Sequence, residues 1–496
     1  MGLSEMKRRD VLMTSLGAAA AASVPYTKAS ASDVSANTLK GEQTVLTKAE
    51  LKEFGDSLRG KLLLPSSDGY DQARKIWNGM WNDKRPALVA RCSGIKDVLN
   101  AVKFARTHDL LVALRGGGHS ISGKSICEGG MVIDMSPMDS VHVDPFEKTA
   151  RVEPGVLLGA LDRASQHFGL ATTAGVVSHT GAAGLTLGGG IGRLQRKHGL
   201  TIDNLISADV ITPDGRFLRA SQEDNQDLFW GLRGGGGNFG IVTSFEYQLH
   251  QVGPKVLNVS FMYPLSDAKD VLNFYFDFNM NTPDDLYIGA GLVIPPGEPG
   301  FAMISGCYFG ELEEGERLLE PLRKFGIPMF GNIGPIDYVD LQSRNDRNNA
   351  HGHYYYAKSG FFTDIETAVV DNAVDRFAGT ASRRTLLLIS PFGGAVGRVA
   401  EDATAFSHRD TQYQIEISSG WENADFSDGN VQWCRRYWDA LEPLTSGGFY
   451  VNFLVDQGQQ QVNENYRGNH DRLVALKNKY DPTNFLRLNA NIKPTI

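Results

Sequence analysis

One histidine stands where chemistry would be expected, at the end of a glycine run that reads Arg115-Gly116-Gly117-Gly118-His119. The run follows residues 110–114, an apolar stretch whose length and composition predict a buried strand. Glycine has no Cβ and tolerates positive φ, so the backbone of such a loop can approach a flat or anionic ligand closely. The segment predicts a binding loop that carries one reactive side chain, His119.

Two further segments, residues 175–192 and 231–240, are also dominated by glycine and small residues. Such segments cannot build a core of their own. Their backbone N–H groups can bind phosphate, and the missing side chains leave room for a planar ring. Three loops of this kind predict a ligand that combines a long diphosphate with a flat ring system.

Competing motifs fit less well. Residues 118–125 match the phosphate-binding pattern G-x-x-x-x-G-K-S, but that chemistry needs a helix beginning at Lys124-Ser125. Two glycines and an apolar strand, 131–135, follow instead, so a P-loop nucleotide hydrolase is disfavoured. The glycines at 231–240 are followed by a predicted strand, whereas the glycines of a dinucleotide-binding fingerprint must be followed by a helix. His351 and His353 lack carboxylate or cysteine neighbours at metal-binding spacing, so no metal site is expected.

The elements that would position these loops are short. Strands are expected at 87–92, 140–144, 149–155 and 241–249, helices at 95–110 and 156–169, and a hairpin at 207–221. After His250 the glycine clusters thin out, and strands such as 286–294 alternate with helices such as 315–326. A domain boundary is therefore expected near residues 252–254. At roughly 100–200 residues per domain, a chain of 496 residues holds two or three domains.

The first 31 residues are expected to be removed rather than folded. Arg8-Arg9, an apolar stretch at 11–24 and Ala29-Ser30-Ala31 form a twin-arginine secretory signal, which predicts a periplasmic or secreted protein. The apolar stretch is shorter than the roughly 20 residues that span a bilayer, and no later segment qualifies. The net charge of −8 argues against nucleic acid as a partner. The four cysteines form no C-x-x-C pair, which leaves free thiols or one disulfide.

Five separated segments carry a family resemblance. Residues 86–92, 115–138, 179–205, 228–243 and 480–492 resemble, in the family's order, the FAD-linked oxidases of the vanillyl-alcohol oxidase/p-cresol methylhydroxylase superfamily. Within it, the chain looks like the berberine-bridge-enzyme-like branch. The resemblance implies an α+β fold: a two-lobed FAD-binding domain of the p-cresol methylhydroxylase type, residues 45–252, with a C-terminal segment, 450–496, returning to it. A substrate domain, an antiparallel sheet backed by helices, is expected to be inserted at 253–449.

The family also implies how FAD is held. His119 stands where the family bonds a histidine to the flavin 8α-methyl, and Val177 stands where many members have a second, cysteinyl tether. One covalent bond is therefore expected. The remaining residues that the resemblance assigns to cofactor binding are Arg115, Gly116, Gly117, Gly118, Ser120, Gly123, Gly175, Gly181, Gly184, Gly188, Gly189, Gly192, Gly240, Ile241, Val242, Asn489 and Asn491.

The implied reaction is hydride transfer from a C–OH or C–N bond of a small organic substrate to the flavin, which oxygen or another acceptor then reoxidises. Gly175 stands where this branch associates glycine with oxygen access, which favours an oxidase over a dehydrogenase. Tyr450 is the expected catalytic base, with Asn452 orienting the substrate, because related enzymes with Y-x-N place that tyrosine over the flavin. A non-catalytic exported binding protein stays open as an alternative. No motif in residues 255–449 specifies the substrate or the oligomeric state.

Overall fold

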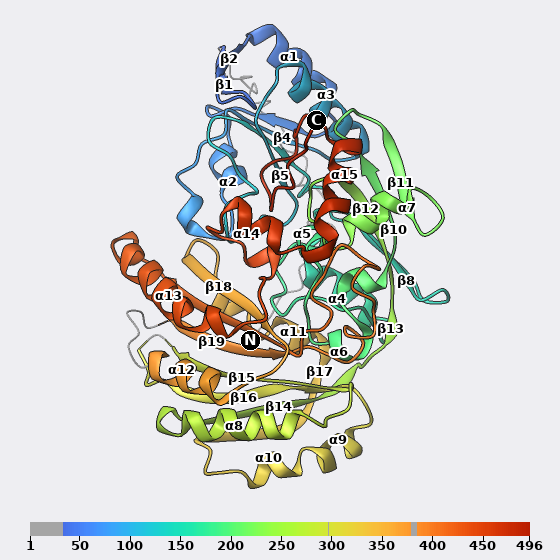
Figure 1. The fold of residues 1–496 in the computed structure, drawn as a ribbon. Coiled ribbons are helices and arrows are strands. Elements are labelled where there is room, and N and C mark those ends of the chain that lie inside the picture. Colours follow the sequence, from blue (N-terminus) through green and yellow to red (C-terminus); the bar gives the residue numbers. More distant parts are fainter. Residues whose placement is uncertain (1–32, 296, 378–383) are drawn as a thin grey trace, which may run out of the picture.

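The computed structural model describes residues 33–295, 297–377 and 384–496, and the expected signal peptide at 1–31 lies outside them. The chain forms two lobes (Figure 1). The first lobe contains the N-terminal half together with the C-terminal segment. The second, which we call the inserted lobe, is built around one large sheet formed between residues 255 and 421.

The first lobe has two main sheets. The four-stranded sheet has the order β3-β4-β6-β5, in which β4, β5 and β6 run parallel. The five-stranded sheet is antiparallel and has the order β11-β10-β12-β8-β7. Their strands are β3 (Lys61–Leu63), β4 (Leu88–Arg91), β5 (Val112–Arg115), β6 (Met131–Asp134), β7 (Val141–Asp144), β8 (Thr149–Val152), β10 (Leu205–Ile211), β11 (Phe217–Ser221) and β12 (Ile241–Gln248).

The inserted lobe is organised by a seven-stranded antiparallel sheet with the order β17-β14-β16-β15-β19-β20-β18. Its strands are β14 (Lys255–Pro264), β15 (Leu286–Ile294), β16 (Phe301–Tyr308), β17 (Phe330–Asp337), β18 (Tyr354–Phe362), β19 (Thr385–Pro391) and β20 (Tyr413–Trp421). Successive side chains of a strand point to opposite faces. In β20, Ile415 and Ile417 are fully buried in the core beneath the helices, so Gln414, Glu416 and Ser418 face the other way.

Most helices of the inserted lobe cover one face of this large sheet. Contacts join α8 to β15 and β16, α9 to β14, and α13 to β18 and β20, while α12 packs on α8 and α13. The helices are α8 (Ala268–Asn279), α9 (Leu312–Leu318), α10 (Glu320–Lys324), α12 (Thr367–Phe377) and α13 (Ser427–Leu441). The opposite face is turned toward the first lobe. A shorter helix, α11 (Tyr338–Ser343), packs on α4 (Leu158–Gln166) of the first lobe and joins the two.

The C-terminal segment returns to the first lobe. Its helices α14 (Gln459–Glu464) and α15 (His470–Tyr480) lie among the elements of the N-terminal half in Figure 1, and α15 contacts α7 (Gln226–Leu232). Leu473, Leu476 and Tyr480 of α15 join the core that also holds β8, β10 and β12. Their burial removes apolar surface from water at about 25 cal/mol per Å², which fixes the tail to the lobe.

The α+β fold class predicted from the sequence is confirmed. Most expected elements appear within a few residues of their predicted ends, including α3 (Ile95–Thr107) at 95–110. The expected helix at 315–326 is instead two, α9 and α10, separated at Leu319. The segment 175–192 contains an unpredicted helix, α5 (Ala182–Leu187), whose small residues let it pack against neighbouring backbone. No helix begins at Lys124-Ser125, so the segment 118–125 is not the phosphate-binding loop of a P-loop nucleotide hydrolase.

Two further features bear on the sequence expectations. The four cysteines are buried free thiols. Within the three described ranges, no helix combines the length and apolarity that a membrane crossing requires.

Candidate active site

A cavity of about 870 Å³ lies between the two lobes. The first lobe supplies its glycine-rich walls, and the face of the seven-stranded sheet that is turned toward the first lobe supplies its floor. Pockets that hold small molecules and cofactors typically measure ~300–1,000 Å³ and favour such interfaces. The cavity is therefore the candidate site for both a cofactor and a substrate.

Most of the residues that the sequence assigned to the site line this cavity. They are Gly116, Gly117, Gly118, His119, Ser120, Gly175, Gly181, Gly184, Gly188, Gly240, Ile241, Val242, Tyr450, Asn452 and Asn489. Five others are not among the lining residues: Arg115, Gly123, Gly189, Gly192 and Asn491. Arg115 donates a hydrogen bond to the Ala73 carbonyl and lies 3.8 Å from the Asp134 carboxylate.

Glycine is required where two of the loops cross. A Cβ on Gly117 would lie 2.5 Å from the Gly181 Cα, and a Cβ on Gly181 would lie 2.6 Å from the Gly117 nitrogen. Both neighbours are backbone atoms, which cannot move aside as a side chain would. The crossing brings the loop of His119 against the start of α5, so two segments far apart in sequence form one wall.

His119 is held on both sides by aromatic rings. Its imidazole stacks on the Trp77 indole at 4.2 Å between centroids, and Trp77 stacks in turn on Tyr355 at 4.1 Å. Its Nε2 lies 3.2 Å from His179 Nδ1, and the exposed His351 ring lies 4.7 Å from that of His179. Burial, with help from the two neighbouring histidines, lowers the pKa of His119 to about 3. The imidazole is therefore neutral near pH 7 and keeps a free electron pair.

Tyr450 is less suited to be a base than its position in the chain indicated. It lies just before a 3-10 turn, and its hydroxyl oxygen accepts hydrogen bonds from Gly190 N at 3.2 Å and Asn452 Nδ2 at 2.8 Å. Those donors favour the phenolate, but burial is the larger effect and raises the pKa of Tyr450. The structure therefore brings Tyr450 and Asn452 together at the cavity without identifying either as the base.

Glu416 is a candidate base that sequence reasoning missed. It lies on the cavity-facing side of β20, and burial raises the pKa of its carboxyl from about 4.5 to about 7, against a hydrogen bond from Ser418. The Glu416 side chain keeps some exposed surface because it borders the cavity, but the cavity itself lies inside the molecule, so the carboxyl group is deeply buried. A base whose pKa lies near the working pH is well matched to proton transfer. The alternation in residues 413–418 could have revealed a carboxylate on the polar face of a buried strand.

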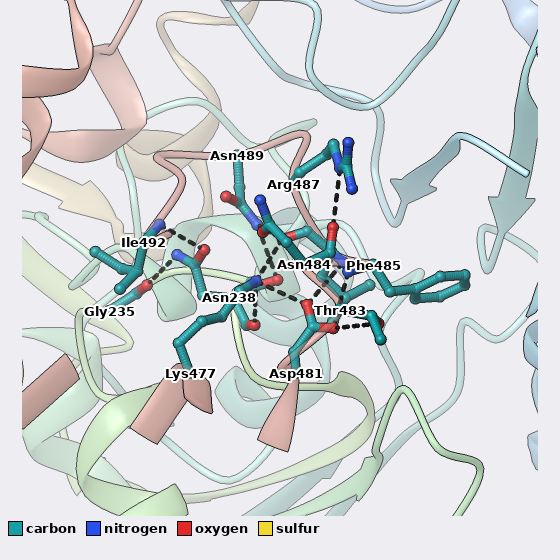
Figure 2. Close-up of polar contacts among 12 residues, drawn as sticks. Gly235, Asn238, Lys477, Asp481, Thr483, Asn484, Phe485, Arg487, Asn489 and Ile492 are labelled. Carbon is teal, nitrogen blue, oxygen red and sulfur yellow. Dashed lines mark hydrogen bonds and ion pairs between the residues drawn. The ribbon is translucent and has the colours of Figure 1, made fainter. Parts of the chain in front are cut away.

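The C-terminal segment is clamped to the third glycine-rich loop by a buried ion pair (Figure 2). Lys477 Nζ lies 2.7 Å from Asp481 Oδ2 and also donates to the carbonyls of Asn238 and Leu486. Asn489 Nδ2 donates to the Gly237 carbonyl at 3.0 Å, and Asn238 Nδ2 to that of Ala490 at 2.9 Å. These bonds fix residues 486–490, several of which line the cavity, against Gly236 and Gly237.

The cavity walls fit FAD in two ways. Several buried polar atoms on or near the walls have no hydrogen-bond partner within the protein, among them Ser125 Oγ, His179 Nε2 and Asn489 Oδ1. Buried polar groups are nearly always paired, so these atoms point to a ligand that completes them. The glycine loops leave space beside them for a diphosphate and a flat ring. No cluster of metal-ligating side chains occurs in the part of the chain that the structure describes.

Comparison with known proteins agrees with this fit. The FAD binding domain model matches residues 86–221, and the model "Berberine and berberine like" matches residues 449–493. An FAD-linked oxidoreductase of Dictyostelium discoideum is 33% identical over 449 residues, covering 90% of this chain and 97% of the relative. The (R)-6-hydroxynicotine oxidase of Paenarthrobacter nicotinovorans is 29% identical, covering 88% of this chain and 97% of the relative.

A solved structure also matches the overall fold of this chain. The crystal structure of 6-hydroxy-D-nicotine oxidase from Arthrobacter nicotinovorans superimposes with a TM-score of 0.81 at 28% identity, covering 88% of this chain and 98% of that one. Fold, cavity and sequence relatives therefore agree on FAD and on oxidoreductase chemistry. The chain belongs to the FAD-linked oxidoreductases of the berberine-bridge-enzyme-like family.

Proposed function

We propose that this FAD-dependent oxidoreductase is an oxidase that takes a hydride from a C–OH or C–N bond of a small organic substrate. Its flavin is bonded to His119 alone, and oxygen is the acceptor. The observation that carries the proposal is that one cavity holds both a neutral, rigidly stacked His119 and a carboxyl group, Glu416, with a pKa near 7. A dehydrogenase of the same fold using another acceptor is the alternative.

Each side chain has a defined task in this proposal. Bound FAD supplies the ring that accepts the hydride. Glu416 accepts the proton from the substrate hydroxyl or amine, because its carboxylate is available near neutral pH and borders the cavity. Tyr450 and Asn452, which hydrogen-bond each other, orient the substrate. The glycine loops and the clamped C-terminal segment position the cofactor and exclude water.

The single tether is supported by the surroundings of His119. A neutral imidazole has the electron pair that a bond to the flavin 8α-methyl carbon would require, and His179, 3.2 Å away, can accept the proton that His119 gives up. The C–H bond replaced at that methyl group would leave its electron pair on the flavin ring and release its proton to solvent, and the acceptor would then reoxidise the ring. Val177 lines the same cavity but has no nucleophilic atom. The names of the oxidase relatives support oxygen as acceptor, and Gly175 lines the cavity as the family's oxygen-accessible glycine would.

The tether can be tested by denaturing the protein with acid. Yellow colour should stay in the wild-type pellet, His119→Ala should release it to the supernatant, and Val177→Ala should behave as the wild type. His179→Ala should bind FAD but bond it more slowly. Complete release of flavin from the wild type would contradict the proposal.

The acceptor is tested separately by hydrogen peroxide. An oxidase forms one peroxide for each substrate oxidised in air, whereas a dehydrogenase bleaches its flavin and stays bleached until another acceptor is added. Gly175→Val should slow reoxidation more than flavin reduction. A wild-type flavin that stays reduced in air would favour the dehydrogenase.

We further propose export through the twin-arginine pathway, on the basis of Arg8-Arg9 and the apolar stretch that follows. Changing both arginines to lysine should leave the precursor in the cytoplasm with its flavin bound. Normal export of that double variant would contradict the twin-arginine route and leave general secretion as the alternative.

A further inference from the structure

One corner of the cavity carries two guanidinium groups, which we call the arginine corner: Arg193 and Arg344. Burial, reinforced by repulsion from Arg193, lowers the pKa of Arg344 to about 10. The Arg344 guanidinium therefore stays charged near neutral pH. Like charges held side by side in a buried site cost free energy unless an anion compensates them.

The partners of the arginine corner within the protein are neutral. Arg193 Nη1 donates to Gln342 Oε1 at 2.7 Å, and Arg344 Nη1 donates to Asn258 Oδ1. Over the described ranges, no carboxylate lies at ion-pairing distance from either guanidinium. Asp162 lies near enough to act on Arg193, but burial raises its pKa to about 7, and it does not line the cavity. It compensates one guanidinium at most.

Two buried arginines outside the cavity lie beside acids. Arg409 is almost fully buried, and both its terminal nitrogens lie 2.8 Å from the carboxylate of Asp203. Arg196 lies 3.9 Å from Asp284. The arginine corner differs from both of these sites, and it lines the cavity. Guanidinium groups with neutral partners that line a cavity suit an anionic ligand.

We infer that the substrate carries a carboxylate, which binds at the arginine corner while the carbon to be oxidised lies at Glu416. This inference rests on the proposed function, since it names the substrate class of the same site. Guanidinium groups suit a carboxylate because their parallel N–H donors match its two oxygens. The cavity-facing hydroxyls of Tyr287, Ser305 and Ser390 add donors for a polar substrate body.

The sheet register indicates how far apart the two ends of the substrate lie. The charges of Arg193 and Arg344 both act on the hydroxyl of Tyr287, which places that residue beside the corner. Glu416 of β20 pairs with Leu388 of β19, and Leu388 pairs with Gly291 of β15. Gly291 therefore lies two strands from Glu416, and Tyr287 lies four residues from Gly291 along β15. At ~4.8 Å per strand and ~3.3 Å per residue, the two backbones lie roughly 16 Å apart. The carboxylate is therefore separated from the oxidised carbon by a ring or a chain of several atoms.

Binding to the flavin-loaded protein tests this inference with acids and their neutral counterparts. The pairs are D-glucuronate with D-glucose, and 4-hydroxyphenylacetate with 4-hydroxyphenylacetamide. The readouts are the perturbation of the flavin absorbance and the shift of the thermal unfolding midpoint. At least one acid should bind roughly 30-fold or more tightly than its neutral counterpart, the lower end of the cost of losing one partner of a buried charge pair.

Three variants locate the effect. Arg344→Gln should abolish the preference for the acid, and Arg344→Lys should restore part of it. Arg347→Gln changes an exposed arginine three residues away and should leave the preference intact. If Arg344→Gln does not fold, the comparison of acid with neutral ligand in the wild type still decides the matter.

Two results would overturn the inference. One is equal binding of acid and neutral ligand by the wild type, and the other is displacement of the acid by inorganic phosphate at lower concentration, which would assign a phosphate site. Yellow colour and the bond to His119 are measured on the same protein without any acid. A protein that is yellow and tethered but indifferent to carboxylates would contradict this inference alone.

Discussion

The two sides of the cavity are built by different means. On the cofactor side, recognition comes from the backbone: glycines cross where a Cβ would meet main-chain atoms, as at Gly117 and Gly181. On the substrate side, recognition comes from side chains that rise from the floor of the seven-stranded sheet, such as Glu416 and Tyr287. A backbone-built wall constrains the residue type at each position. A side-chain-built floor lets the residue type vary as long as the register holds.

The largest loss in the rate of flavin reduction is expected when Glu416, on the sheet floor of the cavity, is changed. Glu416→Gln keeps the shape of the side chain but cannot accept a proton. Anaerobic flavin reduction by substrate should slow by about 10²–10⁴-fold, the usual contribution of a general base. Flavin content should not change. Stopped-flow absorbance of the flavin band measures the rate, and Glu422→Gln, an exposed residue just after β20, is the matched control.

The raised pKa of Glu416 should affect the reaction rate and the stability of the protein in opposite directions as the pH rises. Because the pKa of Glu416 is about 7, the wild-type rate should rise as pH increases through 7, whereas Glu416→Gln should show no such rise. Between pH 4.5 and 7 the Glu416 carboxyl keeps its proton in the folded state but loses it in the unfolded chain. The free energy of unfolding therefore decreases as the pH rises from 4.5 to 7. The variant should therefore gain thermal stability relative to the wild type above pH 7. A wild-type rate independent of pH from 5 to 9 would argue against this base.

Two alanine substitutions in the glycine walls should have contrasting effects. Gly117→Ala forces a methyl group against the Gly181 backbone and should cost ~1–3 kcal/mol, the usual penalty of overpacking. Gly184→Ala meets no atom within 4 Å and lies in helix α5, so folding should be unaffected or slightly improved. Gly184 lines the cavity, however, so the added methyl group should reduce flavin uptake. Thermal unfolding and flavin content separate the two effects.

This difference also explains what could be predicted from the sequence. Loops that must be glycine carry their function in a local pattern, so His119 and the three glycine-rich segments were found without a structure. Trp77, which stacks on His119, lies 42 positions earlier in the chain and belongs to no motif. Tyr287 of β15 and Glu416 of β20 line one cavity only because the strands are ordered β17-β14-β16-β15-β19-β20-β18. That order depends on long-range pairing, which single-sequence patterns do not encode.

The smallest expected effect concerns Tyr450, at the point where the two sides of the cavity meet. Tyr450→Phe keeps the ring packed against Phe453 and removes only the hydroxyl. Asn452 Nδ2 and the Gly190 N–H then lose their acceptor, which should cost ~1–3 kcal/mol of stability. Because burial raises the pKa of the phenol, its loss as a base should matter little, and flavin reduction should slow about tenfold or less through misplacement of the substrate. If Tyr450→Phe instead slowed reduction by about 10²–10⁴-fold while Glu416→Gln did not, the base would be the phenol, as the sequence first indicated. The ratio of the two rates thus decides whether the proton leaves toward the floor of the inserted lobe or toward the C-terminal segment.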